Sequence, residues 1–345
     1  MAEDDLFSRL FELFNQPGPV NWKLAGEVAR HMAGESQAID PWAAEQIVEL
    51  GGLAQASLDN EAPFPVPVLA VSVLDPREWV NQALESFGYA AEAIAEATVN
   101  TVPGMGAALA GMQVGTLVGG IASGTAASFE AGLPMEGSPR LLIVGPGVER
   151  LQKNIGVDVR EVRLGVVASE IAHSALFRVP WLTEHLSRLL GAYAVHLVPD
   201  PEKLMEVWGG DPASLAERLS DPEALEKLVG GDEGTNHRLA VEAFLAITSG
   251  YRRFLVARSL PNMLPSLERL HSPAPAEAPL LTIPVADPGL TSRGARFCEE
   301  IEKGYGREAV DSIWAGPERL PSDDELEDAT GWAARVLLDD LSTDY

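Results

Sequence analysis

The sequence predicts a mainly α-helical fold with a small β element, in the α+β class. Apolar residues recur at helical spacing through most of the chain. Asp-Pro occurs six times, and an Asp at the N-cap followed by Pro at the first helical position is a strong signal for a helix start. These pairs begin at Asp40, Asp75, Asp200, Asp211, Asp221 and Asp287. Strand signals are few, and the clearest is the run 141–144, which Gly145-Pro146-Gly147 closes.

Length and charge limit the classes of protein to consider. The chain has 345 residues, of which 46% are hydrophobic, so it is long enough to bury a sizeable core. We expect one continuous unit over 1–345, with a helical half at 1–135 and a second half at 136–345. The net charge of −26 argues against binding to nucleic acid or to an anionic membrane surface. Any partner attracted by charge would therefore be basic.

The N-terminal half contains two clear helix patterns and one apolar stretch. An amphipathic helix begins near Trp22, and another follows Asp75, where Glu78 completes a capping box. Residues 97–129 carry no charge and place glycines at every fourth position over 111–119, which allows close helix packing. Polar residues and glycines dilute this stretch, so it predicts a buried helix and no membrane span. Gly119-Gly120 marks where that helix would break.

The C-terminal half begins its main helix at Asp158. The helix over 158–178 is apolar nearly all round, which indicates burial. A second long helix is expected from about Arg238 to Leu260. Residues 272–291 contain five prolines and predict a surface loop. The acidic tail after Pro317 keeps helical spacing, so we expect it to dock as a helix.

Cysteine usage and the N-terminus favour the cytoplasm. Cys298 is the one cysteine, which excludes an intramolecular disulfide and a cysteine zinc site. The chain starts Met-Ala-Glu-Asp-Asp, acidic where a signal peptide would be basic.

Three polar residues on the 158–178 helix form the strongest candidate site. Ser169, Glu170 and His173 lie within five positions of an otherwise apolar helix. Residues four apart share a helix face, and two histidines at this spacing bind zinc in metallopeptidases, where the intervening Glu is the general base. Here the motif is Ser169-Glu170-Ile171-Ala172-His173, so Ser occupies the place of the first His.

The order of several segments is similar to that of a known family. These segments are 19–25 (Pro-Val-Asn-Trp-Lys-Leu-Ala), 77–80 (Arg-Glu-Trp-Val), the glycine-rich helix, 169–173 with Pro180-Trp181-Leu182 after it, and 313–321. The chain resembles the bacterial zincin-like hydrolase family of zinc-dependent metalloproteases, some of which are labelled as associated with deazaflavin-coenzyme biosynthesis. The resemblance covers nearly the whole chain and implies a zincin-like fold.

The resemblance also implies which residues would bind zinc, and two of the three have changed. The family supplies its third ligand from a Glu before a Gly, and the best match here is Ser249-Gly250-Tyr251. A catalytic zinc requires three protein ligands and a water, so His173 would be a ligand left alone. Ser169 and Ser249 then mark lost ligand positions, and Glu170 is the former general base. We therefore expect a catalytically inactive protein that has no cofactor. It would bind a protein or peptide partner in the cleft that once held the substrate.

Three alternatives remain open from the sequence. In a working zinc-dependent peptidase, Glu170 would be the general base and His173 a ligand, joined by His237 or Glu242. The chain could instead be a structural subunit, and the sequence does not specify an oligomeric state. Serine hydrolysis is disfavoured because no Gly-x-Ser-x-Gly elbow occurs. If zinc is lost, Arg252 or Arg253 would supply the charge opposite Glu170.

Overall fold

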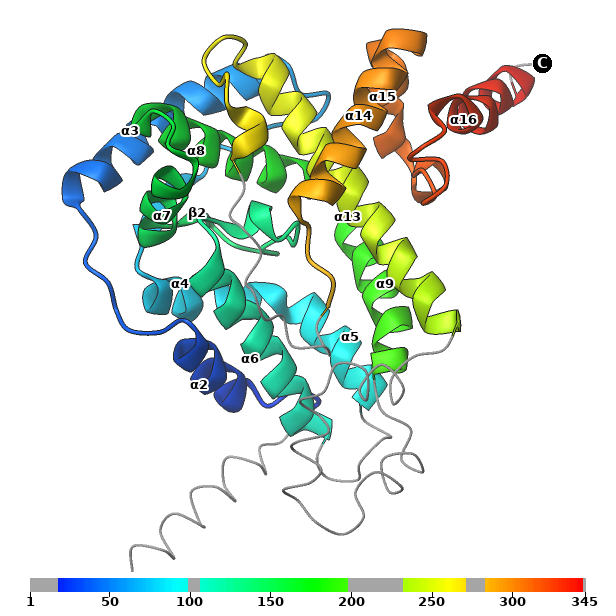
Figure 1. The fold of residues 1–345 in the computed structure, drawn as a ribbon. Helices are drawn as coiled ribbons and strands as arrows, with labels where there is room; N and C mark the ends of the chain where they lie inside the picture. Colours follow the sequence, from blue (N-terminus) through cyan, green and yellow to red (C-terminus); the bar gives the residue numbers. More distant parts are fainter. Residues whose placement is uncertain (1–17, 99–105, 198–231, 271–282, 344–345) are drawn as a thin grey trace, which may run out of the picture.

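The computed structural model describes residues 18–98, 106–197, 232–270 and 283–343 (Figure 1). The first half contains α2 (Trp22–Met32), α3 (Pro41–Asp59), β1 (Ala70–Leu74), α4 (Pro76–Ala83), η1 (Leu84–Phe87), α5 (Gly88–Thr98), α6 (Gly106–Gly124) and η2 (Ser128–Glu130). The second half contains β2 (Arg140–Val144), α7 (Gly145–Ile155), α8 (Val159–Leu176), α9 (Leu182–Leu197), α13 (Asp232–Ser259), η3 (Leu267–Arg269), α14 (Pro288–Tyr305), α15 (Arg307–Asp311), η4 (Ser312–Ala315), η5 (Pro317–Arg319) and α16 (Ala329–Thr343). The prediction of a mainly helical fold with a small β element is confirmed.

Aspartate caps start the helices where the sequence predicts them. Asp40, Asp75 and Asp287 accept backbone N–H groups at the starts of α3, α4 and α14, and Pro follows each of them. Asp158 caps α8 in the same way. The other three Asp-Pro pairs lie outside the described residues.

Two boundaries differ from the prediction. The loop expected over 272–291 was predicted to end too late. Helix α14 already begins at Pro288, where Asp287 caps it. The helix expected from about Arg238 begins earlier, at Asp232. The sheet also has a strand that the sequence analysis missed: β1 pairs in parallel with β2, from Ala70 opposite Arg140 to Leu74 opposite Val144.

Helix α6 is continuous, so the expected break at Gly119-Gly120 is wrong. A Cβ atom on Gly111, Gly115 or Gly119 would lie 2.5–2.6 Å from a backbone oxygen of Asn21, Ala25 or Ala29. The glycines therefore let α6 lie directly against α2. Among the described residues, α6 is the one helix long and apolar enough to cross a membrane, and 56% of its apolar window is buried inside the protein.

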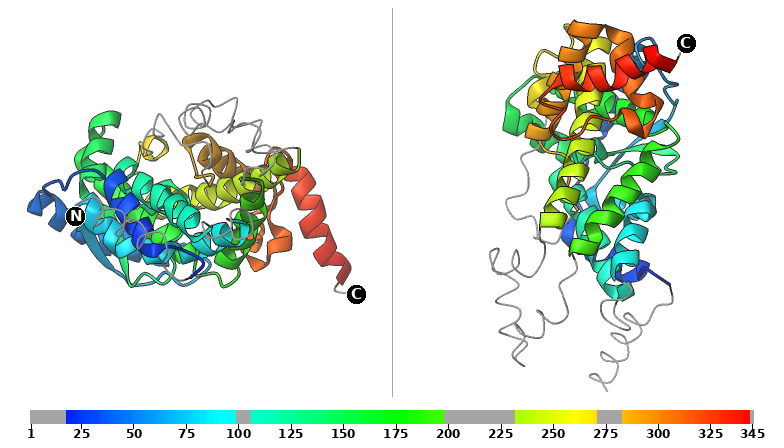
Figure 2. Two further views of the ribbon diagram at one scale, coloured as in Figure 1. Left: turned by 90° about the horizontal axis from the view of Figure 1, so that it is seen from below. Right: turned by 90° about the vertical axis from the view of Figure 1, so that its right-hand side faces the viewer.

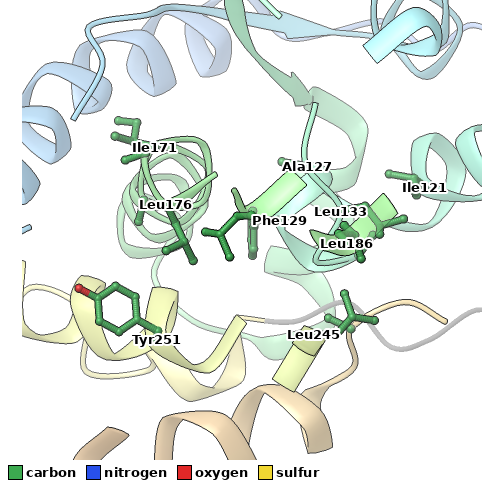
Figure 3. Close-up of a cluster of buried hydrophobic side chains, with 14 of the residues drawn as sticks. Ile121, Ala127, Phe129, Leu133, Ile171, Leu176, Leu186, Leu245 and Tyr251 are labelled. Carbon is green, nitrogen blue, oxygen red and sulfur yellow. The ribbon is translucent and has the colours of Figure 1, made fainter. Parts of the chain in front are cut away.

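Helix α8 lies at the centre of the second half. It contacts α3 on one side and α13 on the other, and it also touches β2 and η2. Helix α13 in turn packs against α9 and α14. The buried side chains form one cluster that runs from Val20 to Val336, and Figure 3 shows part of it between α8 and α13.

The acidic C-terminal helix is docked, as predicted. Trp332 of α16 is fully buried and meets Phe297 of α14 edge-on, with ring centroids 5.6 Å apart. The two views in Figure 2 place α16 at the opposite end of the molecule from α2.

The α2–α6 contact gives the first prediction. We expect Gly115→Ala to lower the free energy of unfolding by about 1–3 kcal/mol, because the added methyl group would overlap the Ala25 oxygen. Gly120→Ala is the matched control, since nothing lies within 4 Å of its Cβ position. It should stabilise the helix by up to about 1 kcal/mol. Urea unfolding of both variants measures the difference, and equal effects would contradict the proposed backbone contact.

Candidate functional site

A cleft of about 800 Å³ lies beside α8 and contains two of the predicted site residues. Glu170 and His173 line it, together with Ser128 of η2 and residues 134–141, which lead into β2. Helices α5 and α9 supply other walls. Ser169 and Ser249 do not line this cleft but are buried behind it.

The Glu170 carboxylate is buried, and each of its two oxygens accepts a hydrogen bond. Its Oε1 accepts a hydrogen bond from Ser128 Oγ at 2.8 Å, and its Oε2 accepts one from the Phe129 N–H at 3.0 Å. The side chain is 1% exposed. Burial raises the pKa of Glu170 to about 7, although these two hydrogen bonds and the charge of Arg252 act in the opposite direction.

Arg252 brings a buried positive charge to this region. It is 3% exposed, and its guanidinium lies 4.5 Å from the centre of the Phe129 ring. Its burial lowers the pKa of Arg252 to about 10, opposed by the charges of Glu130 and Glu170. Arg253 points elsewhere and donates to Ser292 Oγ at 3.0 Å. Of the two arginines named as counter-charges, Arg252 is therefore the one that acts on Glu170.

The His173 imidazole is neutral and makes no well-formed hydrogen bond. It is 2% exposed, and neither Nδ1 nor Nε2 has a partner at hydrogen-bond distance and angle, although the Leu133 backbone lies near the ring. Its ring meets Phe177 edge-on at 4.8 Å between centroids. Burial and the charge of Arg252 lower the pKa of His173 to about 3, against a smaller opposing effect of the Leu133 backbone.

The two serines at the ligand positions that the resemblance assigns lie on facing helices. The Oγ atoms of Ser169 on α8 and Ser249 on α13 are buried and have no hydrogen-bond partner. Gly132 lies next to Ser249, since a Cβ atom on it would be 3.1 Å from the Ser249 Oγ. The Gly132 φ of +70° also requires glycine. The turn that follows η2 thus passes beside Ser249 at Gly132. At Leu133 it passes beside His173.

These side chains do not fit a catalytic zinc ion. The positions that the resemblance assigns to zinc ligands now carry one imidazole and two neutral hydroxyls, and a buried guanidinium lies close by. The described part of the chain contains no group of three or more His, Cys, Asp or Glu that could hold a metal ion. A second cation next to Arg252 would also be repelled.

The alternative ligands His237 and Glu242 have partners of their own. His237 stacks on His196 with centroids 5.0 Å apart, and Glu242 pairs with Arg238 at 2.7 Å. His237 is twelve residues before Ser249, which corresponds to about 18 Å along a helix. In the described part of the chain, neither residue belongs to a group of three or more His, Cys, Asp or Glu that could hold a metal ion.

The sequence analysis missed the residues that hold Glu170. Ser128 and Phe129 precede it by 42 and 41 positions and belong to no recognisable motif. They are placed by Ala127, which is extended and bridges to Ile143 of β2.

Comparison with known proteins found a family and a solved structure that are similar to this chain. The model of the family described as zincin-like metallopeptidase matches residues 20–277 and 286–333. The fold is similar to a crystal structure from Chloroflexus aurantiacus described as a candidate hydrolase with a novel fold. The TM-score is 0.54 at 20% identity, and the match covers 92% of this chain and 98% of that one. No curated protein matches the sequence.

The raised pKa of Glu170 predicts a measurable dependence of stability on pH. Between pH 4.5 and about 7 the folded chain holds a proton that the unfolded chain has released, so stability from this group falls as pH rises. The change should be on the order of 3 kcal/mol. We expect Glu170→Gln to lose this slope when urea unfolding is followed from pH 5 to 8. The exposed Glu49→Gln is the control, and a slope retained in Glu170→Gln would contradict the assignment.

His173 should make the stability of the fold depend on pH in the opposite direction. Its pKa falls from 6.5 to about 3 on folding, so the unfolded chain binds a proton first as pH drops below 6.5. Stability from this group is complete above pH 6.5 and is lost toward pH 3, by on the order of 5 kcal/mol. His173→Leu should therefore resist acid better than the parent chain. Circular dichroism during acid titration measures this, and identical acid midpoints would refute it.

Proposed function

The chain belongs to the zincin-like metallopeptidase family, and we propose that its zinc site has decayed and that it acts by binding a protein or peptide in the cleft beside α8. The observation that carries this proposal is the buried Arg252 guanidinium near Glu170. It supplies a positive charge to a carboxylate that would otherwise be buried without one.

The charge of Arg252 bears on metal binding in two ways. A guanidinium cannot release its proton in a protein at neutral pH, so this positive charge is permanent. It offsets the charge of Glu170, and it opposes a divalent ion nearby. Together with serine at two of the three ligand positions, it favours a protein without a metallopeptidase reaction.

The cleft supports a binding role. Its volume of about 800 Å³ lies within the range typical of ligand sites, roughly 300–1,000 Å³. A metallopeptidase cleft accommodates a polypeptide before cleaving it, so loss of the metal alone would leave a shape suited to a peptide. We place this role in the cytoplasm, with which the free, buried thiol of Cys298 is compatible.

A working metal-dependent hydrolase is the second candidate, and one observation favours it. A pKa of about 7 at Glu170 suits a general base, which works best when its pKa is near the operating pH. Metal content separates the two candidates.

Metal content tests the proposal directly. We expect the chain, purified without added metal or chelator, to contain well under 0.1 zinc per molecule by elemental mass spectrometry, even after zinc is offered; this threshold is roughly an order of magnitude below one bound ion. About one zinc per chain, with peptidase activity abolished by chelator and by Glu170→Gln, would establish the hydrolase instead.

Restoring the ligands gives a sharper form of the same test. The double variant Ser169→His with Ser249→Glu recreates three protein ligands. We expect it to bind zinc weakly while Arg252 remains, and at least about tenfold more tightly when Arg252→Met is added, because the repulsion is removed. Competition with a chromogenic chelator measures both affinities. Equal affinities would show that Arg252 does not oppose metal.

A further inference from the structure

Carboxylates dominate the mouth of the cleft. The lining includes three exposed glutamates, each from a different segment: Glu92 on α5, Glu136 in the segment before β2 and Glu184 on α9. Within the described part of the chain, none of the three forms an ion pair. The lining cations are Arg140, whose guanidinium donates to Ser72 Oγ, and Arg178. The local charge is therefore negative, as is that of the whole chain.

One buried polar side chain that lines the same cleft lacks a partner for its hydroxyl. Tyr89 is 6% exposed and its hydroxyl makes no hydrogen bond, while its backbone oxygen accepts from Ser187 Oγ at 3.3 Å. Buried polar atoms are almost always hydrogen-bonded, so the unpartnered Tyr89 hydroxyl indicates a polar ligand.

The chemistry of these groups selects the kind of ligand. The Tyr89 phenol stays protonated at neutral pH, because burial and the nearby Glu136 carboxylate raise its pKa. Its oxygen can still accept a hydrogen bond. Glu136 adds a charged acceptor near Tyr89. An ammonium or guanidinium group carries only donors, so it is complementary to such a set of acceptors.

We propose that the peptide held in the cleft presents a lysine or arginine side chain to Tyr89 and Glu136, with Glu92 and Glu184 attracting it at the mouth. This inference rests on the proposed binding function and specifies its partner. The partner is a basic segment of a protein, and its charge is recognised locally as well as by the field of the whole molecule.

Binding of matched peptides tests the inference. The probes are three fluorescein-labelled peptides of equal length on an alanine background, which differ only in carrying Lys, Gln or Glu at the central positions. Fluorescence anisotropy with the full-length chain should give an affinity for the Lys peptide at least about tenfold above that for the Gln peptide. The Glu peptide should bind more weakly still.

Four variants separate the cleft from the overall charge. Glu136→Gln and Tyr89→Phe should each weaken binding of the Lys peptide several-fold, whereas Arg178→Gln should strengthen it. Tyr89→Phe removes a hydroxyl that has no partner, so the fold should keep its stability, which thermal unfolding checks. Glu49→Gln changes the total charge equally at an exposed site on α3 outside the cleft and should have no effect.

The outcomes distinguish this inference from the proposed function. If Glu49→Gln and Glu136→Gln weaken binding equally, the attraction is general and the inference is overturned. If the Gln peptide binds as well as the Lys peptide, and Tyr89→Phe weakens both, the cleft binds peptides without this charge preference. If none of the three peptides binds, both proposals fail.

Discussion

The buried carboxylate of Glu170 is the constraint on which the site depends. A carboxylate in an apolar interior must receive hydrogen bonds and an opposing charge, or it becomes protonated. Here the hydrogen bonds come from η2 and the charge comes from α13, two segments far apart in the chain. One side chain on α8 therefore fixes the relative positions of three elements. Phe129 also contributes through its ring, on which the Arg252 guanidinium lies. Figure 3 shows Phe129 in the same buried cluster as Leu176 of α8 and Leu245 of α13.

The contact between α13 and α14 explains why a glycine follows Ser249. A Cβ atom on Gly250 would overlap the backbone of α14 at Gly294, and one on Gly294 would overlap the Ala246 backbone. Two helices can approach this closely only where both lack a side chain. Gly250 is therefore required by packing, whatever happens to zinc. Ser249 is also fully buried, but its hydroxyl makes no hydrogen bond. The close contact with α14 therefore depends on Gly250 and not on its neighbour.

Local signals in the sequence predicted what is locally determined. The Asp caps and the apolar spacing located the helices, because capping involves residues two or three positions apart. Strand β1 was missed because its five residues are mostly half-buried and carry a weak pattern. The sequence named Arg252 and Arg253 together, since both lie within one turn of Ser249, and only the rotation of α13 in the packed core decides between them. Ser128 and Phe129 could not be inferred, because a long-range contact brings them to Glu170. The sequence likewise offered His237 and Glu242 as ligands from their places on one helix, whereas in the fold they pair with His196 and Arg238.

The geometry also gives Glu170 a role that is independent of any reaction. Glu170 accepts hydrogen bonds from the first two residues of η2, and Ser128 is at once a donor to Glu170 and a lining residue of the cleft. The chain then runs from η2 through residues 134–141, which form one wall of that cleft, into β2. Removing the carboxylate would leave a buried N–H and a buried hydroxyl without an acceptor, a cost of about 1–3 kcal/mol for each. The carboxylate thus has a structural role that does not depend on zinc. Because the same contacts shape the wall of the cleft, that wall keeps its form whether or not the site holds zinc.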